Sequence, residues 1–348
     1  MTSSRHVSKP LRSILRAATL LAALPAAAFA QDTAGPKSIN TGGAQGAYHS
    51  VFCPPLPPAL SRAYFNNYTC TTSRGTLENI ERVMATPSAI GFAQLDVYAR
   101  EAARRTADFQ RLTVIRRDIA CEGLWMVTKN ERLQNYGDVQ GFARRIHFIL
   151  PPLGSGSAAS FAFLRENDNE GLGRVPDGNI RHVADATEVI RAVAASTDGA
   201  VGFFVQFADP TNANIRLLVE QNLRIVPVVS REIMRSRVDG EAVYQVQEFA
   251  LTEGGFLGIG GRARNATTAC TPVAIFTGNP DAVPAGNARD DQRDLVLRVR
   301  ETPAAQLLPS QGGIARILSG ARRMSQTAVQ GMEHAAEAAK QAAQRATN

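Results

Sequence analysis

The chain has 348 residues, 44% of them apolar and 20% charged, which is enough to fill one large core or two ordinary ones. This composition excludes disordered, collagen-like and coiled-coil chains. The formal charge of +7 is 38 basic minus 31 acidic residues; four basic residues and no acid lie in the first thirty, so the remainder carries 34 minus 31, or +3. A balance that small, without runs of Lys and Arg, excludes a nucleic-acid partner.

Residues 1–30 have the parts of a secretory signal peptide: a basic segment ending near Arg16, an apolar stretch, and small residues at Ala28 and Ala30. The alternative is a membrane anchor. An anchor needs about 20 apolar residues, whereas the stretch over 17–30 is shorter and contains a proline. No later segment is apolar for long enough to span a bilayer. We therefore expect cleavage before Gln31 and export to a bacterial periplasm.

Four cysteines, Cys53, Cys70, Cys121 and Cys270, lie beyond the expected cleavage point, and an oxidising compartment allows them to pair. Four cysteines permit three pairings, which the sequence alone leaves open. Cys53 with Cys70 would close a short loop, and Cys121 with Cys270 would join distant segments. No CxxC motif is present and no cluster of cysteines and histidines has ligand spacing, so we expect no metal site.

Short apolar strands alternate with amphipathic helices along the mature chain. The strand-like runs KSINTG, NYTCTTS, AIGFAQ, RLTVIRR and GLWMVTK are separated by LENIERVMA and DVYAREAARR, which have helical spacing. A second series follows residue 129: RRIHFILPP, a helix over 157–166, NIRHVA, the helix ATEVIRAVAAS, AVGFFVQF and RIVPVV. We therefore expect an α/β protein with largely parallel sheets in two lobes.

The segments ACEGLWMVTK and ACTPVAIFTG share a rhythm, in which a cysteine precedes an alternating apolar run with a Thr near its end. We interpret both as strands of the first lobe, one leaving it and one returning, which predicts a hinged clamshell with two crossings. The expected organisation is a signal peptide over 1–30, lobe 1 over 31–129, lobe 2 over 130–264, a return to lobe 1 over 265–308 and a C-terminal helical tail over 309–348. For that tail, a solvated helix and a basic docking segment both stay open.

Glycine-rich segments give no support to catalysis. PLGSGSAAS lacks the GxSxG order of a hydrolase nucleophile, GIGGRA follows no convincing strand, and no GK[ST] follows a glycine-rich loop. Instead, a polar or glycine-rich turn joins a strand to a helix at 41–43, 73–76 and 154–157. Because amide groups at a helix N-terminus attract anions, we expect these turns to converge on a carboxylate in one cleft. For any single turn, an ordinary N-cap is the alternative.

In order and spacing, INTGGAQGAYHS, CTTSRGTLENIERV, IGFAQLDVY and LPPLGSGS resemble motifs of the TAXI-type solute receptors of tripartite TRAP transporters. The resemblance covers about residues 37–283. It implies a type 2 periplasmic binding-protein fold, a small anionic solute as ligand and a TRAP-type membrane permease as partner, with no catalytic residue and no cofactor. Carried over by position, it implies ligand contacts from Thr41, Gly42, Gly43, Tyr48, Ser73, Gly75, Thr76, Asn79, Gln94, Asp96, Ser155 and Ser157.

The resemblance also implies a Cys53–Cys70 disulfide, which leaves Cys121 for Cys270. If the strands of this second pair run antiparallel, cysteines at both N-terminal ends should lie apart.

The chain departs from the family pattern at three places. CPPLPP should interrupt the first helix, because proline removes amide donors. Leu95 replaces a small polar residue, and Arg74 replaces a glycine, where it would either clamp a ligand carboxylate or fill the pocket.

The expected function is that of a periplasmic solute-binding protein of a TRAP-type transporter, capturing a small carboxylate or amino-acid solute by hinge closure. The alternative is a periplasmic sensor-input or interaction protein on the same fold, without a role in transport.

Overall fold

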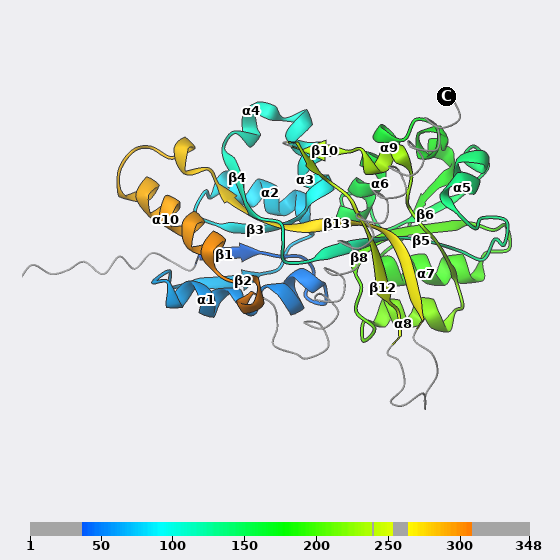
Figure 1. Ribbon diagram of the computed structural model, residues 1–348, viewed down its shortest axis with the longest axis horizontal. Helices are drawn as coiled ribbons and strands as arrows, with labels where there is room; N and C mark the ends of the chain where they lie inside the picture. The colour runs from blue at the N-terminus through cyan, green and yellow to red at the C-terminus, as the bar shows by residue number, and fades with distance from the viewer. Residues whose placement is uncertain (1–36, 239, 253–263, 308–348) are drawn as a thin grey trace, which may run out of the picture. The chain divides into compact units, whose positions relative to one another are not determined.

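The computed structural model describes residues 37–238, 240–252 and 264–307. The expected signal peptide, the GIGGRA segment and the C-terminal tail lie outside these residues. Among the described residues, no helix combines the length and the apolar character needed to cross a bilayer. These residues form two α/β halves that share one long strand, β13 (Figure 1).

The first half contains a sheet with the strand order β2-β1-β3-β13-β4. β1 pairs in parallel with β2 and β3, whereas β13 lies antiparallel between β3 and β4. The elements of this half are β1 (Lys37–Asn40), a π-helix (Tyr48–Phe52), α1 (Leu56–Arg62), β2 (Tyr68–Thr71), α2 (Thr76–Ala85), β3 (Ile90–Gln94), α3 (Leu95–Arg104), α4 (Thr106–Phe109), β4 (Leu112–Arg116), the later part of β13 (Asn265–Gly278) and α10 (Asn287–Glu301).

The second half contains a sheet with the order β7-β6-β8-β5-β9, and β12 pairs with the first part of β13 beside it. β6 is parallel to β7 and β8, whereas β5 is antiparallel to β8 and β9. The elements are β5 (Cys121–Thr128), α5 (Tyr136–Phe142), β6 (Phe148–Leu150), α6 (Gly156–Asn167), β7 (Ile180–His182), α7 (Ala186–Ala195), β8 (Val201–Phe207), α8 (Ala213–Glu220), β9 (Arg224–Val226), α9 (Arg231–Met234), β10 (Arg237–Val238), β11 (Glu241–Ala242) and β12 (Gln245–Ala250).

Both halves repeat one strand order, in which the second, first and third strands are parallel and one antiparallel strand comes from a crossing segment. The chain crosses between the halves twice, after β4 and along β13. This is the two-lobed, clamshell fold of type 2 periplasmic binding proteins, as predicted. The sheets are mixed rather than largely parallel, because both crossing strands run against their neighbours.

The crossing strand β5 lies in the second-half sheet, where it pairs with β8 and β9. Our assignment of its sequence to the first lobe therefore differs from the observed pairing. β13 agrees with our expectation only from Val273 onward, where it pairs with β3, because residues 265–272 pair with β12 and β5 of the second half. β5 is buried along its whole length, and such a strand carries no periodic signal that distinguishes one sheet from another.

Helices cover both faces of each sheet (Figure 1). In the first half, Phe92 of β3 packs in a cluster with α1, whereas the adjacent Ala93 packs with α2 and α3 on the opposite face. In the second half, Leu124 and Trp125 of β5 divide in the same way between two clusters. Alternate residues of a strand point to opposite faces, so these buried pairs place both strands in the middle of a three-layer structure.

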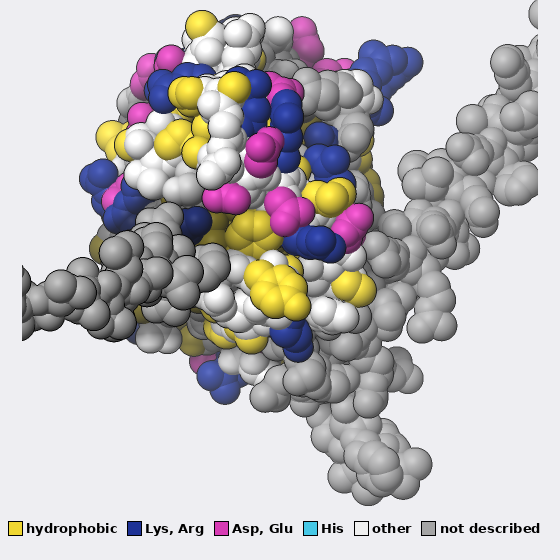
Figure 2. Space-filling model, turned by 90° about the vertical axis from the view of Figure 1, so that its left-hand side faces the viewer, with side chains coloured by type: hydrophobic (Ala, Val, Ile, Leu, Met, Phe, Trp, Pro, Cys, Tyr) yellow, Lys and Arg dark blue, Asp and Glu magenta, His cyan; other side chains and the backbone are white. Residues whose placement is uncertain are grey.

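The helix α10 covers the first half with an apolar stripe. Leu295 and Val299 are buried, while Asp294 and Arg298 form an ion pair of 3.7 Å on the outer face. Figure 2 shows basic and acidic side chains interspersed over this side of the molecule. Exposed pairs of this kind each stabilise a helix by only about 0.3–0.5 kcal/mol, so burial of the apolar stripe holds α10 in place.

Two disulfides are present, with the pairing that the resemblance implied. Cys53 bonds to Cys70 of β2, with 6.0 Å between their Cα atoms. The expected interruption by CPPLPP lies beside this bond, since the π-helix ends at Phe52 and α1 begins at Leu56.

The second disulfide joins Cys121 to Cys270 at 5.5 Å between Cα atoms, across the antiparallel strands β5 and β13. The expectation that antiparallel strands would hold these cysteines apart is wrong. Cys270 lies inside the 14-residue strand β13 rather than at its start, and it pairs with Gly123, two residues from Cys121. This bond therefore joins the two crossing segments where the halves meet.

Candidate functional site

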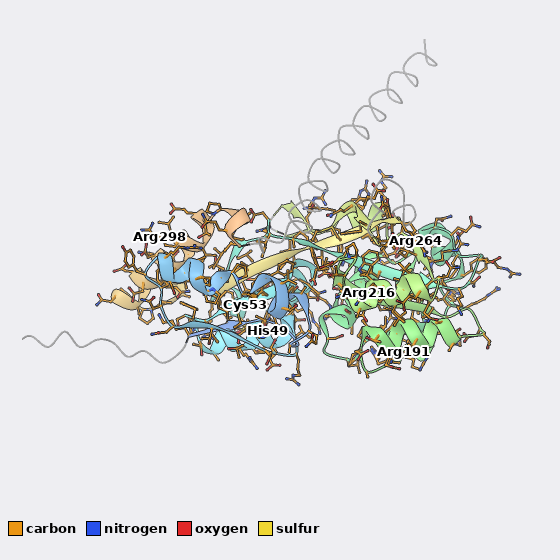
Figure 3. The ribbon with its side chains drawn as sticks, turned by 90° about the horizontal axis from the view of Figure 1, so that it is seen from below. His49, Cys53, Arg191, Arg216, Arg264 and Arg298 are labelled. Carbon is orange, nitrogen blue, oxygen red and sulfur yellow. A yellow bond between two sulfur atoms is a disulfide. The ribbon has the colours of Figure 1, made fainter. Side chains whose placement is uncertain are left out.

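The first predicted turn begins at Thr41, directly after β1 ends at Asn40. The Thr41 hydroxyl donates to the Thr71 carbonyl at 2.9 Å and lies 3.0 Å from Nδ1 of His49, which is labelled in Figure 3. Gly42 is buried, whereas Gly43 is exposed, with no neighbouring atom within 4 Å of where a Cβ would be. The turn is thus anchored by Thr41 and open at Gly43.

The second predicted turn is tied to the first by Ser73 and Asn79. The Asn79 amide donates to the carbonyls of Thr41 at 2.5 Å and Phe92 at 2.8 Å. The Ser73 hydroxyl lies 2.6 Å from Asn79 Oδ1 and 3.1 Å from the Thr41 carbonyl, and it accepts from the Gly75 amide at 3.0 Å. These polar groups bond to one another, so Ser73 and Asn79 position both turns.

Gly75 and Thr76 start α2. Gly75 has φ +111°, a left-handed conformation that favours glycine. The buried Thr76 hydroxyl accepts from the Gln94 amide at 3.1 Å, which connects the second turn to the end of β3.

Arg74 extends away from these turns. Its side chain is 89% exposed and its Nε lies 2.9 Å from Glu78 Oε2 on α2. Glu78 also accepts from the Arg74 backbone amide, and these bonds, together with Arg82, lower the pKa of Glu78 to about 2. In this conformation Arg74 neither fills a pocket nor extends over the turns.

The third predicted turn meets the first half through Gln94. Ser155 caps α6 by accepting from the Ala158 amide, and the Ser157 hydroxyl accepts from the Val205 amide at 3.0 Å. A Cβ on Gly156 would lie only 1.9 Å from Oε1 of Gln94, so a side chain here would push the Gln94 carboxamide away from the helix. The Gln94 carboxamide therefore lies against the N-terminus of α6.

Two further polar residues, Glu122 and Tyr244, complete the site, and the sequence analysis missed both. The Tyr48 hydroxyl donates to Glu122 Oε2 at 2.7 Å, and the Tyr244 hydroxyl donates to Asp96 Oδ2 at 3.0 Å. Tyr48 and Asp96 belong to the first half, whereas Glu122 and Tyr244 lie in or beside second-half strands. A signal existed for Glu122, because it is the only charged residue in the otherwise apolar or neutral sequence of β5. None existed for Tyr244.

Both carboxyl groups of this set are buried and have raised pKa values. Burial raises the pKa of Glu122 to about 7; the Tyr48 bond opposes this rise and the Asp96 charge adds to it. Burial also raises the pKa of Asp96, against opposing contributions from Ser160, the Val97 amide and Tyr244. No ion pair among the described residues includes either acid, so each is held by hydroxyl and amide groups alone.

The halves are closed on each other at this place. Thr41, Thr76, Asn79 and Asp96 are at most 1% exposed, and Tyr48 is 8% exposed. A cavity of about 740 Å³ lies beside α3 and α4 and another of about 440 Å³ beside β9, and neither is lined by these residues. At the rim, Arg100 of α3 bonds to Glu166 of α6 at 2.7 Å. Side chains of the protein itself therefore occupy the place where the predicted residues meet.

The structure therefore brings the predicted residues of all three turns close to Tyr48, Gln94 and Asp96. Arg74 lies outside this group. Ligand contact stays a prediction for each of them. Within the part of the chain that the structure describes, no group of three potential metal ligands occurs.

No family model and no curated protein matches this chain. Solved structures with a similar shape include the GluR0 ligand-binding core in complex with L-glutamate, 11% identical with a TM-score of 0.44, covering 83% of this chain and 99% of that chain. An ABC-type phosphate transport receptor from Vibrio cholerae is 12% identical with a TM-score of 0.41, covering 78% and 96%. The VFT2 domain of Bordetella pertussis BvgS is 11% identical with a TM-score of 0.40, covering 82% and 92%. At these scores the fold assignment rests on the strand order given above.

Proposed function

We propose that this protein is an exported solute-binding protein that captures a small carboxylate-bearing solute between its halves and presents it to a TRAP-type permease, without catalysing a reaction. The observation that carries the proposal is the convergence of the second and third turns on Gln94, with the first turn joined to the second through Asn79. The Gln94 backbone amide bonds to Thr76 at the start of α2, and the Gln94 side chain lies against Gly156 at the start of α6.

Binding would use the amide groups of the first turns of α2 and α6. Those amides lack partners within their own helices, and the helix dipole favours a negative charge there. At α2, Ser73 and Glu78 satisfy the amides of Gly75 and Arg74. At α6, the neutral Gln94 carboxamide lies where an anion would approach. A ligand carboxylate would displace Gln94 and gain a charge-assisted interaction that the amide does not make.

The closed arrangement also supports a second function. Because Tyr48, Gln94 and Asp96 fill the place between the halves, the protein could act as a periplasmic sensor-input or interaction protein whose cleft no longer takes a solute. The two proposals differ in whether any small acid stabilises the protein.

A thermal-shift screen of mono- and dicarboxylates and amino acids tests the proposal. A ligand at about 100 times its dissociation constant should stabilise the folded protein by about 2.7 kcal/mol. Gly156→Ala should abolish the shift, since the added methyl group would lie where the ligand carboxylate is expected to replace the Gln94 carboxamide. Gly141→Ala is the matched control, because a Cβ there has no neighbour within 4 Å. If no acid raises the melting temperature of the wild-type protein, the binding proposal fails and the interaction function replaces it.

Export and delivery need their own measurements. The N-terminal sequence of the protein recovered from a periplasmic fraction should begin at or near Gln31, whereas an intact Met1 in the cytoplasm would contradict export. Delivery is tested by solute uptake in cells carrying a TRAP-type permease with and without this protein.

A further inference from the structure

A groove lies between the two halves, outside the candidate site. Its cavity of about 740 Å³ is bordered by α3, α4 and β4 of the first half and by α6 and β10 of the second, which gather in the upper part of Figure 1. None of the residues of the three turns lines it. An occupant of this groove would therefore contact both halves without entering the candidate site.

One wall of the groove is a strip of small side chains on α3. Ala99, Ala102 and Ala103 line the groove and, because they lie three and four residues apart, share one face of that helix. Ala103 is exposed, and the half-buried Phe163 of α6 lines the same groove. Since alanine projects only a methyl group, a second helix can approach α3 closely along this strip.

Ser236 adds a polar group that lacks a partner. This residue lines the groove and is only 7% exposed, and its hydroxyl group makes no hydrogen bond within the described part of the chain. Buried hydroxyl groups nearly always have a partner. The groove therefore offers a hydrogen-bonding position to an occupant that carries polar atoms.

The groove is also basic. Arg117 and Arg237 line it, and no acidic residue does so among the residues that the structure describes. The Arg237 guanidinium donates to the backbone carbonyls of Met234 and Ser236, which do not neutralise its positive charge. Opposite charges attract at short range, so the groove favours an acidic occupant.

The C-terminal tail contains a segment with the matching pattern. Its sequence over 332–343, MEHAAEAAKQAA, is rich in strong helix formers. Apolar and mostly small residues recur there with helical spacing at Met332, Ala335, Ala336 and Ala339. Glu333 and Glu337 lie one turn apart along one edge of that stripe, against a single lysine. The segment thus combines a small apolar surface with a net negative charge.

The described chain ends near the groove. Leu307 is buried in the same cluster as Ile115 and Ile119, and Arg117 lies between those two residues in the segment that leaves β4. The 24 residues over 308–331 can span about 80 Å when extended. The tail is therefore long enough to bring residues 332–343 to the groove.

From these observations we infer that residues 332–343 form a helix that docks in the groove, with the small apolar stripe against α3 and the two acids toward Arg117 and Arg237. The docked helix bridges both halves, so the tail is neither a solvated helix nor a basic docking segment. It contains both acids of the tail, whereas the tail's arginines over 316–323 precede it. This inference goes beyond the proposed function and does not depend on solute binding.

Hydrogen exchange of the protein with its complete tail, followed by mass spectrometry, tests this inference. A free helix of this length is marginal in water, so a solvated tail should exchange at nearly the unprotected rate. Docking should slow the exchange of the amides over 332–343 at least tenfold. Ala103→Glu places a larger, negative side chain on the α3 strip and should reduce that protection at least fivefold.

Ala195→Glu is the matched control, because Ala195 is an exposed alanine at the end of α7 and does not line the groove. It should leave the protection of 332–343 within twofold of the wild type. The paired amides of β5 and β8 should exchange slowly in every variant, which shows that the fold is kept.

Charge reversal supplies a second measurement. Arg237 is exposed, and Arg237→Glu should also weaken the protection of 332–343. Adding Glu333→Arg and Glu337→Arg to Arg237→Glu should restore at least half of the protection, because the charges are again opposite. Failure of the combined variant to restore it would contradict the placement of the two acids.

The inference is overturned if 332–343 is unprotected in the wild-type protein, or if its protection survives Ala103→Glu. Protection that increases with protein concentration would place the tail on a second copy of the chain and would overturn it as well. Protection that is independent of concentration, lost in Ala103→Glu and kept in Ala195→Glu supports docking in the chain's own groove.

Discussion

Replacing Glu122 by glutamine should change how the stability of the protein depends on pH. Burial raises the pKa of Glu122 from its ordinary value of 4.5 to about 7. The folded protein therefore keeps a proton that the unfolded chain loses, and the free energy of unfolding falls as the pH rises from 4.5 to about 7. At about 1.4 kcal/mol for each pKa unit, the loss is about 3 kcal/mol, complete above pH 7. Glutamine does not ionise and can still accept the proton of Tyr48.

Urea unfolding of the wild type and Glu122→Gln at pH 4, 6 and 8 measures this loss. The variant should gain about 3 kcal/mol relative to the wild type between pH 4 and pH 8, with most of the change between pH 5 and 7. Glu81→Gln, at an exposed acid, should follow the wild type over the same range. Parallel curves for the wild type and Glu122→Gln would show that this carboxyl group is ionised in the folded protein at neutral pH, and would refute the reasoning.

Three other substitutions follow from the disulfides and from Arg74. Cys70→Ser opens a bond with a sequence separation of 17 and should cost about 3 kcal/mol, seen as a drop of several degrees in melting temperature; peptide mapping that finds both thiols free would contradict this. Cys121→Ser opens the second disulfide, which has a sequence separation of 149, and should lower the free energy of unfolding by about 5 kcal/mol. An unchanged melting temperature would contradict this stabilisation. Arg74→Ala should leave solute affinity within twofold, because Arg74 is exposed and bonded to Glu78. A tenfold loss of affinity by calorimetry would instead support the hypothesis that Arg74 binds a ligand carboxylate.

Local sequence patterns predicted most of the elements of the fold. AIGFAQ, RLTVIRR and AVGFFVQF contain β3, β4 and β8, and LENIERVMA and ATEVIRAVAAS match α2 and α7 to within one residue at each end. The two helices have amphipathic patterns, and the three strands are short runs rich in apolar residues. Strand partnership was not predictable in the same way for β5, because its pairing with β8 joins residues about 80 positions apart through an apolar run that fits either sheet.

The residues of the site that stand in local sequence motifs were predictable, whereas those brought in by the tertiary fold were missed. The turns at Thr41, Ser73 and Ser155 are visible as polar breaks between a strand and a helix, and they do approach one another. The direction of Arg74 depends on Glu78 one turn later, a local pair that competes with any ligand. Tyr244 approaches Asp96 from 148 residues away, and no local pattern contains that contact.

The shared strand β13 also sets an order of events during synthesis and folding. Val273 pairs with Gln94, and Gly278 pairs with Leu112, so the first-half sheet cannot close until the ribosome has made nearly all of the described chain. Contacts between such distant residues form slowly, because a long loop must close before they stabilise anything. For the proposed export, such a delay would keep the precursor unfolded for longer, which suits passage through a membrane channel before the sheet is complete.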